Sequence, residues 1–158
     1  MMVLYFDGLC EPKNPGGVAT YGYILHDDDR KVREECGVVG AGMFGDDVSN
    51  NVAEYTAMIR GMAHLLHTGY KGRLTVRGDS QLTIRQMKGE YKVRAKRLVP
   101  LHEKAVALKG EFETVTFEWV PREANEEADQ LSRRAFEEFL SKTYRKYKEY
   151  YSRAHKKN

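Results

Sequence analysis

Apolar residues recur along this chain at two spacings, and the order in which the spacings alternate limits the folds it can adopt. Strand-like runs of apolar, β-branched and aromatic residues occupy 3–6, 18–26, 31–39, 73–80 and 112–121. Helical spacing marks 52–66, a short stretch after Ser80, residues 96–109 and a long segment from about Asn125. The resulting order, β-β-β-α-β-α-α-β-α, predicts an antiparallel meander followed by strands that pair in parallel through crossovers. We therefore expect an α/β fold with a mixed sheet and helices on its faces.

The length and composition are those of one ordinary domain. The 158 residues are 41% hydrophobic, which is enough for a single core. No stretch approaches the ~20 apolar residues of a membrane span, and the N-terminus lacks the basic region of a secretory signal. Two cysteines, Cys10 and Cys36, make neither a disulfide framework nor a zinc site. We expect a cytoplasmic monomer with no membrane partner and free thiols.

Charge is distributed unevenly along the chain. The segment 141–158 holds seven basic residues and one acid, whereas the preceding 140 residues hold 19 basic and 22 acidic residues. We predict one catalytic domain over 1–140, with 141–158 as a basic, Tyr-rich helical extension of the same domain. The tyrosines of this extension, Tyr144, Tyr147 and Tyr151, either pack on the body or present a surface that contacts phosphates.

Two predicted strands deliver an aspartate at their ends, Asp7 and Asp79. If these strands are parallel neighbours, about 4.8 Å apart, the two carboxylates converge where ligands bind in open α/β sheets. Glu54, at the start of the first helix, can add a third carboxylate. A site made of oxygen ligands selects Mg²⁺ or Mn²⁺. Position alone leaves the alternative that each aspartate is a turn or cap residue.

The stretch WVPREANEEADQLS, residues 119–132, offers candidates for a fourth carboxylate: Glu123, Glu126, Glu127 and Asp129. Asn125 and Asp129 are four residues apart and share a helix face. Glu126 and Glu127 fall in the first turn, where acids favour the helix dipole. The predicted buried stripe beside that face is Ala124, Ala128, Leu131 and Ala135. Periodicity alone does not choose between Asp129 and Glu127.

Four motifs together resemble ribonuclease HI, the type 1 ribonuclease H, in a compact archaeal-like form. They are FDG with NPGG (6–17), SNNVAEY (49–55), GDSQL (78–82) with QMKGEYKV (86–93), and VPREANEEAD (120–129). The resemblance implies a ribonuclease H-like fold with a five-stranded mixed sheet. It also implies a metal-dependent endoribonuclease that cleaves the RNA strand of RNA/DNA hybrids and leaves 5′-phosphates. The implied ligands of two Mg²⁺ ions, with Mn²⁺ as a substitute, are Asp7, Glu54, Asp79 and Asp129.

Substrate contacts also follow from this resemblance. The residues implied to read the RNA backbone and its 2′-hydroxyls are Cys10, Glu11, Asn50 and Gln81. Those implied to hold a DNA phosphate are Asn14, Ser49 and Asn51. Amides suit a 2′-hydroxyl because they both donate and accept. The alternative for residues 49–51 is simple helix capping.

The chain departs from well-known bacterial members at two places. Their His-bearing glycine loop is replaced by PREAN, in which Arg122 either stabilises phosphate oxygens during catalysis or pairs with a neighbouring acid. Their basic protrusion is reduced to EYKVRAKR, residues 90–97, and some compact relatives also cut double-stranded RNA, which we keep as a possible extra activity. Two rival functions are a non-catalytic hybrid-binding module and a metal-dependent exonuclease. The four acids argue against the first, and the lack of Asp-x-Glu at Asp7 argues against the second.

Overall fold

In the computed structural model, five strands form one mixed sheet in the order β3-β2-β1-β4-β5. The structure describes the backbone of residues 1–156 and the side chains of residues 1–152. The strands are β1 (Met2–Glu11), β2 (Val18–Asp27), β3 (Arg30–Ala41), β4 (Arg73–Gly78) and β5 (Thr114–Trp119). The helices are α1 (Asn50–His67), α2 (Gln81–Met87), α3 (Val99–Lys109) and α4 (Glu126–Lys156), with 3₁₀ turns η1 (Gly42–Phe44) and η2 (Arg122–Asn125). The predicted α/β class, strand order along the chain and five-stranded mixed sheet are confirmed.

Strand pairing follows the predicted pattern. β1 and β2, and β2 and β3, pair antiparallel, whereas β1 pairs parallel with β4, and β4 with β5. The expectation that β1 ends at Asp7 is wrong, because β1 continues to Glu11 along β2. Its pairing with β4, however, stops at Tyr5, opposite Arg77. Asp7 therefore lies inside a strand but beyond the end of its parallel neighbour.

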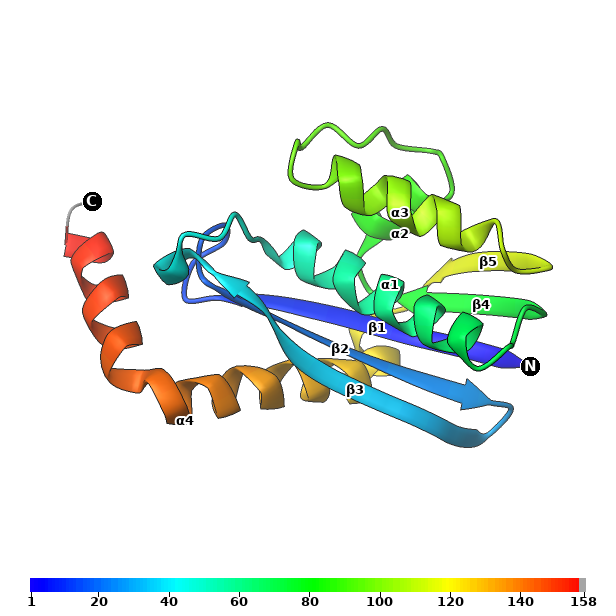
Figure 1. Ribbon diagram of the computed structural model, residues 1–158, viewed down its shortest axis with the longest axis horizontal. Helices are drawn as coiled ribbons and strands as arrows, with labels where there is room; N and C mark the ends of the chain where they lie inside the picture. Colours follow the sequence, from blue (N-terminus) through cyan, green and yellow to red (C-terminus); the bar gives the residue numbers. More distant parts are fainter. Residues whose placement is uncertain (157–158) are drawn as a thin grey trace.

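The first face of the sheet is covered by α1, with α3 packed on α1 (Figure 1). Ser49 is the N-cap of α1, and its Oγ accepts a hydrogen bond from the Val52 amide at 3.2 Å. The buried core here joins Leu4 and Phe6 of β1 to Met58 and Met62 of α1. Gly8 permits the close approach, since a Cβ there would lie 2.5 Å from the Glu54 nitrogen. The start of α1 is thus pressed against the middle of β1.

The opposite face is covered by α4, which crosses β2 and β3 (Figure 1). Gly22 of β2 allows this packing, because a Cβ there would lie 2.7 Å from the Leu131 Cβ. Ala128, Leu131 and Ala135 are buried as predicted, but Ala124 is exposed. Ala124 belongs to η2, whose tighter turn takes it off the stripe that 3.6-residue periodicity predicts.

The remaining helices and the tail differ from expectation only in detail. α3 begins at Val99 rather than near residue 96, and Ser80 caps α2 as expected. α4 continues through the predicted boundary at residue 140, with non-helical dihedral angles at Thr143 (φ −132°, ψ 16°). Positions 157 and 158 of the predicted extension lie outside the described residues. None of the helices in the described part of the chain is long and apolar enough to cross a membrane.

Candidate active site

Asp7 and Asp79 occupy matching positions on neighbouring parallel strands. The last paired residues of β1 and β4 are Tyr5 and Arg77, so each aspartate lies two residues beyond that pair. The carboxyl group of Asp129, in the first turn of α4, lies close enough to that of Asp7 to raise its pKa. The structure therefore brings together three of the acids that the sequence pointed to, from β1, the end of β4 and the start of α4.

Asp7 is 7% exposed, and this burial controls its ionisation. Removal from water disfavours the charged form and raises the pKa of Asp7 from 3.8 to about 8. Part of this rise comes from the negative charge of Asp79 and from Asp129, whereas the backbone of Gly8 opposes it. A buried carboxylate beside two others is unfavourable unless a proton or a cation neutralises it.

Glu54 completes the cluster from the second turn of α1. It is 6% exposed, and burial together with the charges of Asp7 and Asp79 raises its pKa well above 4.5. The Thr83 hydroxyl donates to its Oε1 at 3.4 Å. The position of Glu54 follows from Gly8, which lets the backbone of α1 approach β1 at this residue. The side chain thus points from α1 towards the two strand aspartates.

Asp79 is held by two side chains for which no role was predicted. Asn125 of η2 donates from Nδ2 to the Phe6 carbonyl at 2.9 Å and to Oδ1 of Asp79 at 3.2 Å. The indole of Trp119, at the end of β5, donates to the backbone oxygen of Asp79 at 3.1 Å. Asn125 is 2% exposed, and its own Oδ1 is buried without a partner among the described residues. The helix-face argument paired Asn125 with Asp129 but gave no sign of its contact with β4.

Arg122 lies at the edge of the cluster. Its Nε is 3.7 Å from Oδ2 of Asp79, and its side chain is 83% exposed. The two predicted roles of Arg122, contact with phosphate oxygens and pairing with an acid, are therefore compatible. The acid that lies near Arg122 is itself a member of the cluster. The guanidinium is free to reach an anion that approaches from solvent.

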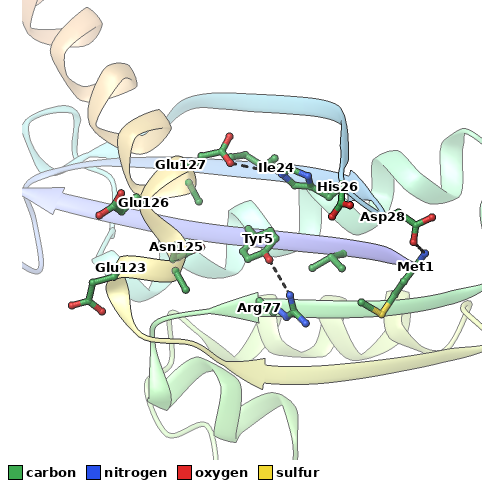
Figure 2. Close-up of a pocket in the computed structure, with 14 residues that line it drawn as sticks. Met1, Tyr5, Ile24, His26, Asp28, Arg77, Glu123, Asn125, Glu126 and Glu127 are labelled. Carbon is green, nitrogen blue, oxygen red and sulfur yellow. Dashed lines mark hydrogen bonds and ion pairs between the residues drawn. The ribbon is translucent and has the colours of Figure 1, made fainter.

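The three glutamates around Asp129 point elsewhere. Glu127 is 3.8 Å from Nε2 of His26 and 3.6 Å from Nζ of Lys31, so it lies over β2 and β3, and Figure 2 shows it beside His26. Glu123 and Glu126 are exposed. All three line a cavity of about 770 Å³ shared with Tyr5 and Arg77, rather than the acidic cluster. Among the carboxylates of residues 119–132, Asp129 is therefore the one that joins Asp7.

The donor set fits a hard divalent cation. All four acids offer oxygen ligands, which Mg²⁺ and Mn²⁺ prefer. The raised pKa values of Asp7 and Glu54 reflect burial first and the charges of neighbouring acids second. Within the described residues, no group of three or more His, Cys, Asp or Glu side chains is spaced as a ready-made metal cage. Asp79 instead contacts Asn125 and Arg122, and Glu54 contacts Thr83.

Three predicted contact residues, Asn14 and Ser49 for the DNA strand and Asn50 for the RNA strand, lie together beside the cluster. Asn14 and Asn50 bond each other twice, from Asn14 Nδ2 to Asn50 Oδ1 at 2.7 Å and from the Asn50 amide to Asn14 Oδ1 at 3.0 Å. The Gly16 amide donates to the Val48 carbonyl at 3.0 Å. Ser49 is buried and caps α1, as the capping alternative predicts. The turn after β1 and the start of α1 are thus fixed to each other.

The other predicted contact residues differ from one another in how far they are exposed. Cys10 is buried, with its thiol against the Lys13 carbonyl at 3.3 Å, so only its backbone can face a substrate. Glu11 is half-exposed and lies 3.5 Å from Arg133. Gln81 is exposed at the start of α2. Asn51 lines a groove of about 600 Å³ with Gln86, Tyr91, Lys92 and Arg94. Tyr91, 47% exposed, is a further candidate that the sequence analysis missed.

Comparison with known proteins gives a consistent family. A family model described as reverse transcriptase-like matches residues 6–135. A bifunctional protein of Mycobacterium tuberculosis is 34% identical over 126 residues, covering 78% of this chain and 32% of that protein. Ribonuclease HI of Halobacterium salinarum is 33% identical over 137 residues, covering 85% of this chain and 63% of that enzyme. The chain thus spans about a third of the mycobacterial relatives and under two thirds of the archaeal one.

Solved structures agree with this result. The N-terminal RNase H domain of a Mycobacterium tuberculosis protein superposes with a TM-score of 0.79 at 32% identity, covering 90% of this chain and 97% of that one. LC11-RNase H1, solved in complex with an RNA/DNA hybrid, gives a TM-score of 0.79 at 33% identity, covering 89% of this chain and 99% of that one. The strand order and helix placement described above are therefore shared with these RNase H structures.

Proposed function

Because the chain belongs to the reverse transcriptase-like family and has the fold of type 1 ribonucleases H, we propose that it hydrolyses the RNA strand of RNA/DNA hybrids. The reaction is endonucleolytic, depends on divalent metal ions and leaves 5′-phosphate products. Cleavage of double-stranded RNA is a possible additional activity, and no contact in the site favours or opposes it.

The observation that carries this proposal is the proximity of Glu54, Asp79 and Asp129 to the buried Asp7. Asp7 and Glu54 are both under 10% exposed, and the pKa of each is raised by burial and by neighbouring carboxylates. Burial of like charges costs stability, and a divalent cation removes that cost. The arrangement is therefore expected for a metal site, whereas a purely structural cluster would gain nothing from it.

Each residue of the cluster would have its own role. Asp7 and Asp79 would hold both ions, Asp129 would hold the second, and Glu54 would orient the attacking water. When bound, a pair of Mg²⁺ ions supplies an activated water and stabilises the leaving oxygen of the phosphodiester. Asn125 and Trp119 keep Asp79 in place through its carboxylate and its backbone. Arg122 extends from solvent towards Asp79 and can contact the non-bridging oxygens of the scissile phosphate.

We assign substrate recognition to the surfaces on either side of the four acids. Glu11, Asn14 and Asn50, on the turn after β1 and the start of α1, offer acceptors and amides to 2′-hydroxyls and phosphates. Gln81, at the start of α2, offers its side-chain amide to the same groups. On the other side, Tyr91, Lys92 and Arg94 line the groove that contains Asn51. An aromatic ring beside cations suits the sugar-phosphate backbone of a DNA strand.

The test is a cleavage assay on labelled hybrid, RNA duplex and DNA duplex of about 20 base pairs, roughly two helical turns. We expect cleavage of the RNA strand of the hybrid with Mg²⁺ or Mn²⁺, none in EDTA, and 5′-phosphate ends on the products. Asp129→Asn should lower turnover at least about 100-fold, the scale of losing a group that stabilises the transition state. Glu126→Gln, an equal charge change three residues earlier, should leave it unchanged. A wild-type protein that binds metal but leaves the hybrid intact would refute the proposal.

A further inference from the structure

The last part of α4 is docked on the body, although it lies beyond residue 135, where the family match ends. The helix changes direction at Thr143, whose hydroxyl donates to the Phe139 carbonyl at 2.6 Å. Beyond this point the helix turns across its earlier direction at the end of the sheet where β1 and β2 are joined (Figure 1). Tyr151, 7% exposed, belongs to a buried cluster with Leu9, Val18 and Phe136. The segment is therefore held in place by packing.

The docking point is the turn that carries proposed substrate contacts. The Tyr151 hydroxyl donates to the Gly16 carbonyl at 3.0 Å, two residues after Asn14. The ring of Tyr147 lies 5.0 Å from that of Tyr151, and the negative charge of Glu11 acts on Tyr147. The helix thus lies beside the 12–17 turn.

Positive charge gathers on the side of this segment that does not face the body. Tyr147 and Tyr151, one turn apart, occupy the inward side, and Glu149 is the one acid between residues 142 and 152. We name as the basic face the four exposed cations Lys142, Arg145, Lys146 and Lys148. Ion pairs of α4 cations involve Arg133 and Arg134, whereas none joins the basic face to the described part of the chain. Its charge is available to an external anion.

We propose that the basic face binds the sugar-phosphate backbone of the duplex that occupies the active site, beyond the 12–17 turn. This inference rests on the proposed function, because the substrate must be a nucleic acid duplex. β1 continues for four residues from Asp7 to Glu11, about 13 Å at 3.3 Å per residue, and the turn and α4 lie further on. A duplex of about ten base pairs centred on the acids ends near the turn, whereas one of about thirty reaches the basic face.

The experiment compares the triple variant Arg145→Gln, Lys146→Gln, Lys148→Gln with the wild type. Binding of fluorescein-labelled hybrids of about ten and about thirty base pairs is measured by anisotropy in EDTA, over a range of salt concentrations. For the longer hybrid we expect the slope of log K against log [salt] to shrink by roughly 1 to 3, since each lost phosphate contact removes about 0.9. Affinity at low salt should fall about tenfold. The short hybrid should show no change.

The matched control is the triple variant Arg30→Gln, Lys71→Gln, Lys104→Gln, which removes three exposed cations from other parts of the chain. It should keep the wild-type slope on both hybrids. An unchanged slope for the α4 variant on the longer hybrid, or an equal loss in both triple variants, would overturn the proposal. The cleavage assay separates the two claims: if the wild type cuts hybrids but the slope is unchanged, the inference about the basic face fails alone.

Discussion

The side-chain amide of Asn125 lies 3.2 Å from Oδ1 of Asp79 and joins the turn before α4 to the end of β4. The same nitrogen bonds the Phe6 carbonyl, one residue before Asp7. One buried side chain therefore connects the elements that carry Asp7, Asp79 and Asp129. The relative positions of these three acids depend on a residue that is not itself acidic.

Substitution of Asn125 by Ala should reduce both stability and turnover. The Phe6 carbonyl loses a buried donor, which costs about 1–3 kcal/mol, or roughly 2–12 °C in Tm for a chain of this size. Asp79 loses the contact that orients it, so kcat should fall by about tenfold or more, with KM for the hybrid little changed. Tm is measured by calorimetry, and kinetics at a temperature where the variant is fully folded. If kcat then equals that of the wild type, Asn125 is only structural.

Arg122→Ala tests whether the exposed guanidinium near Asp79 acts in catalysis. We expect kcat to drop about tenfold without loss of Tm, because an 83% exposed side chain 3.7 Å from a carboxylate contributes little stability. Arg122→Lys should recover part of the rate, since it keeps the charge but loses the planar geometry of the guanidinium. Arg133→Ala, which removes a more distant arginine on α4, is the comparison. Identical kinetics in Arg122→Ala and the wild type would remove Arg122 from the mechanism.

Metal-free protein should lose stability as the pH rises. The pKa of Asp7 is about 8 in the folded chain against 3.8 as its ordinary value, so the folded state holds this proton more tightly. Its stabilising effect is complete below about pH 4 and is lost as the pH passes about 8. Asp7→Asn cannot ionise, so in EDTA at pH 9 its Tm should exceed that of the wild type by several degrees. At pH 4 the two values of Tm should be similar.

Magnesium should reverse this difference. At pH 8 a divalent cation replaces the proton on Asp7, so Mg²⁺ should raise the Tm of the wild type. The Asp7→Asn variant should respond weakly, and Glu123→Gln, which alters an exposed acid of η2, should respond as the wild type does. Equal Mg²⁺ responses in Asp7→Asn and the wild type would show that the ion binds elsewhere.

Much of the fold and of the acidic cluster could be predicted because both depend on local patterns. Alternating apolar residues and uninterrupted early strands indicated the meander, and the crossovers indicated the parallel pairs. Two aspartates after the apolar runs of β1 and β4 therefore had to lie near each other. The exact end of β1 was missed because pairing with β2 extends the strand to Glu11, and that pairing is a tertiary property.

Other features could not be read from periodicity. Asn125 looked like a neighbour of Asp129 on a helix, but η2 turns it towards β1 and β4. The choice of Asp129 over Glu127 depends on which strand each side chain approaches. Asp129 lies near Asp7 of β1, whereas Glu127 lies near His26 of β2 and Lys31 of β3. The path of the tail depends on the change of direction at Thr143. The sequence has neither Gly nor Pro at this position to indicate a break in the helix.

Tyr151→Phe tests whether the tail stabilises the 12–17 turn. The substitution keeps the ring in its apolar cluster and removes only the hydroxyl, so the Gly16 carbonyl loses its donor. Loss of one hydrogen bond should cost about 0.5–1.5 kcal/mol, or roughly 1–6 °C in Tm. Because Gly16 shares its turn with Asn14, KM for the hybrid should rise about two- to fivefold while kcat stays constant. Tyr144→Phe, which alters a 57% exposed tyrosine of the same helix, should change neither value. A lower Tm with an unchanged KM would mean that the tail stabilises the fold without positioning the turn.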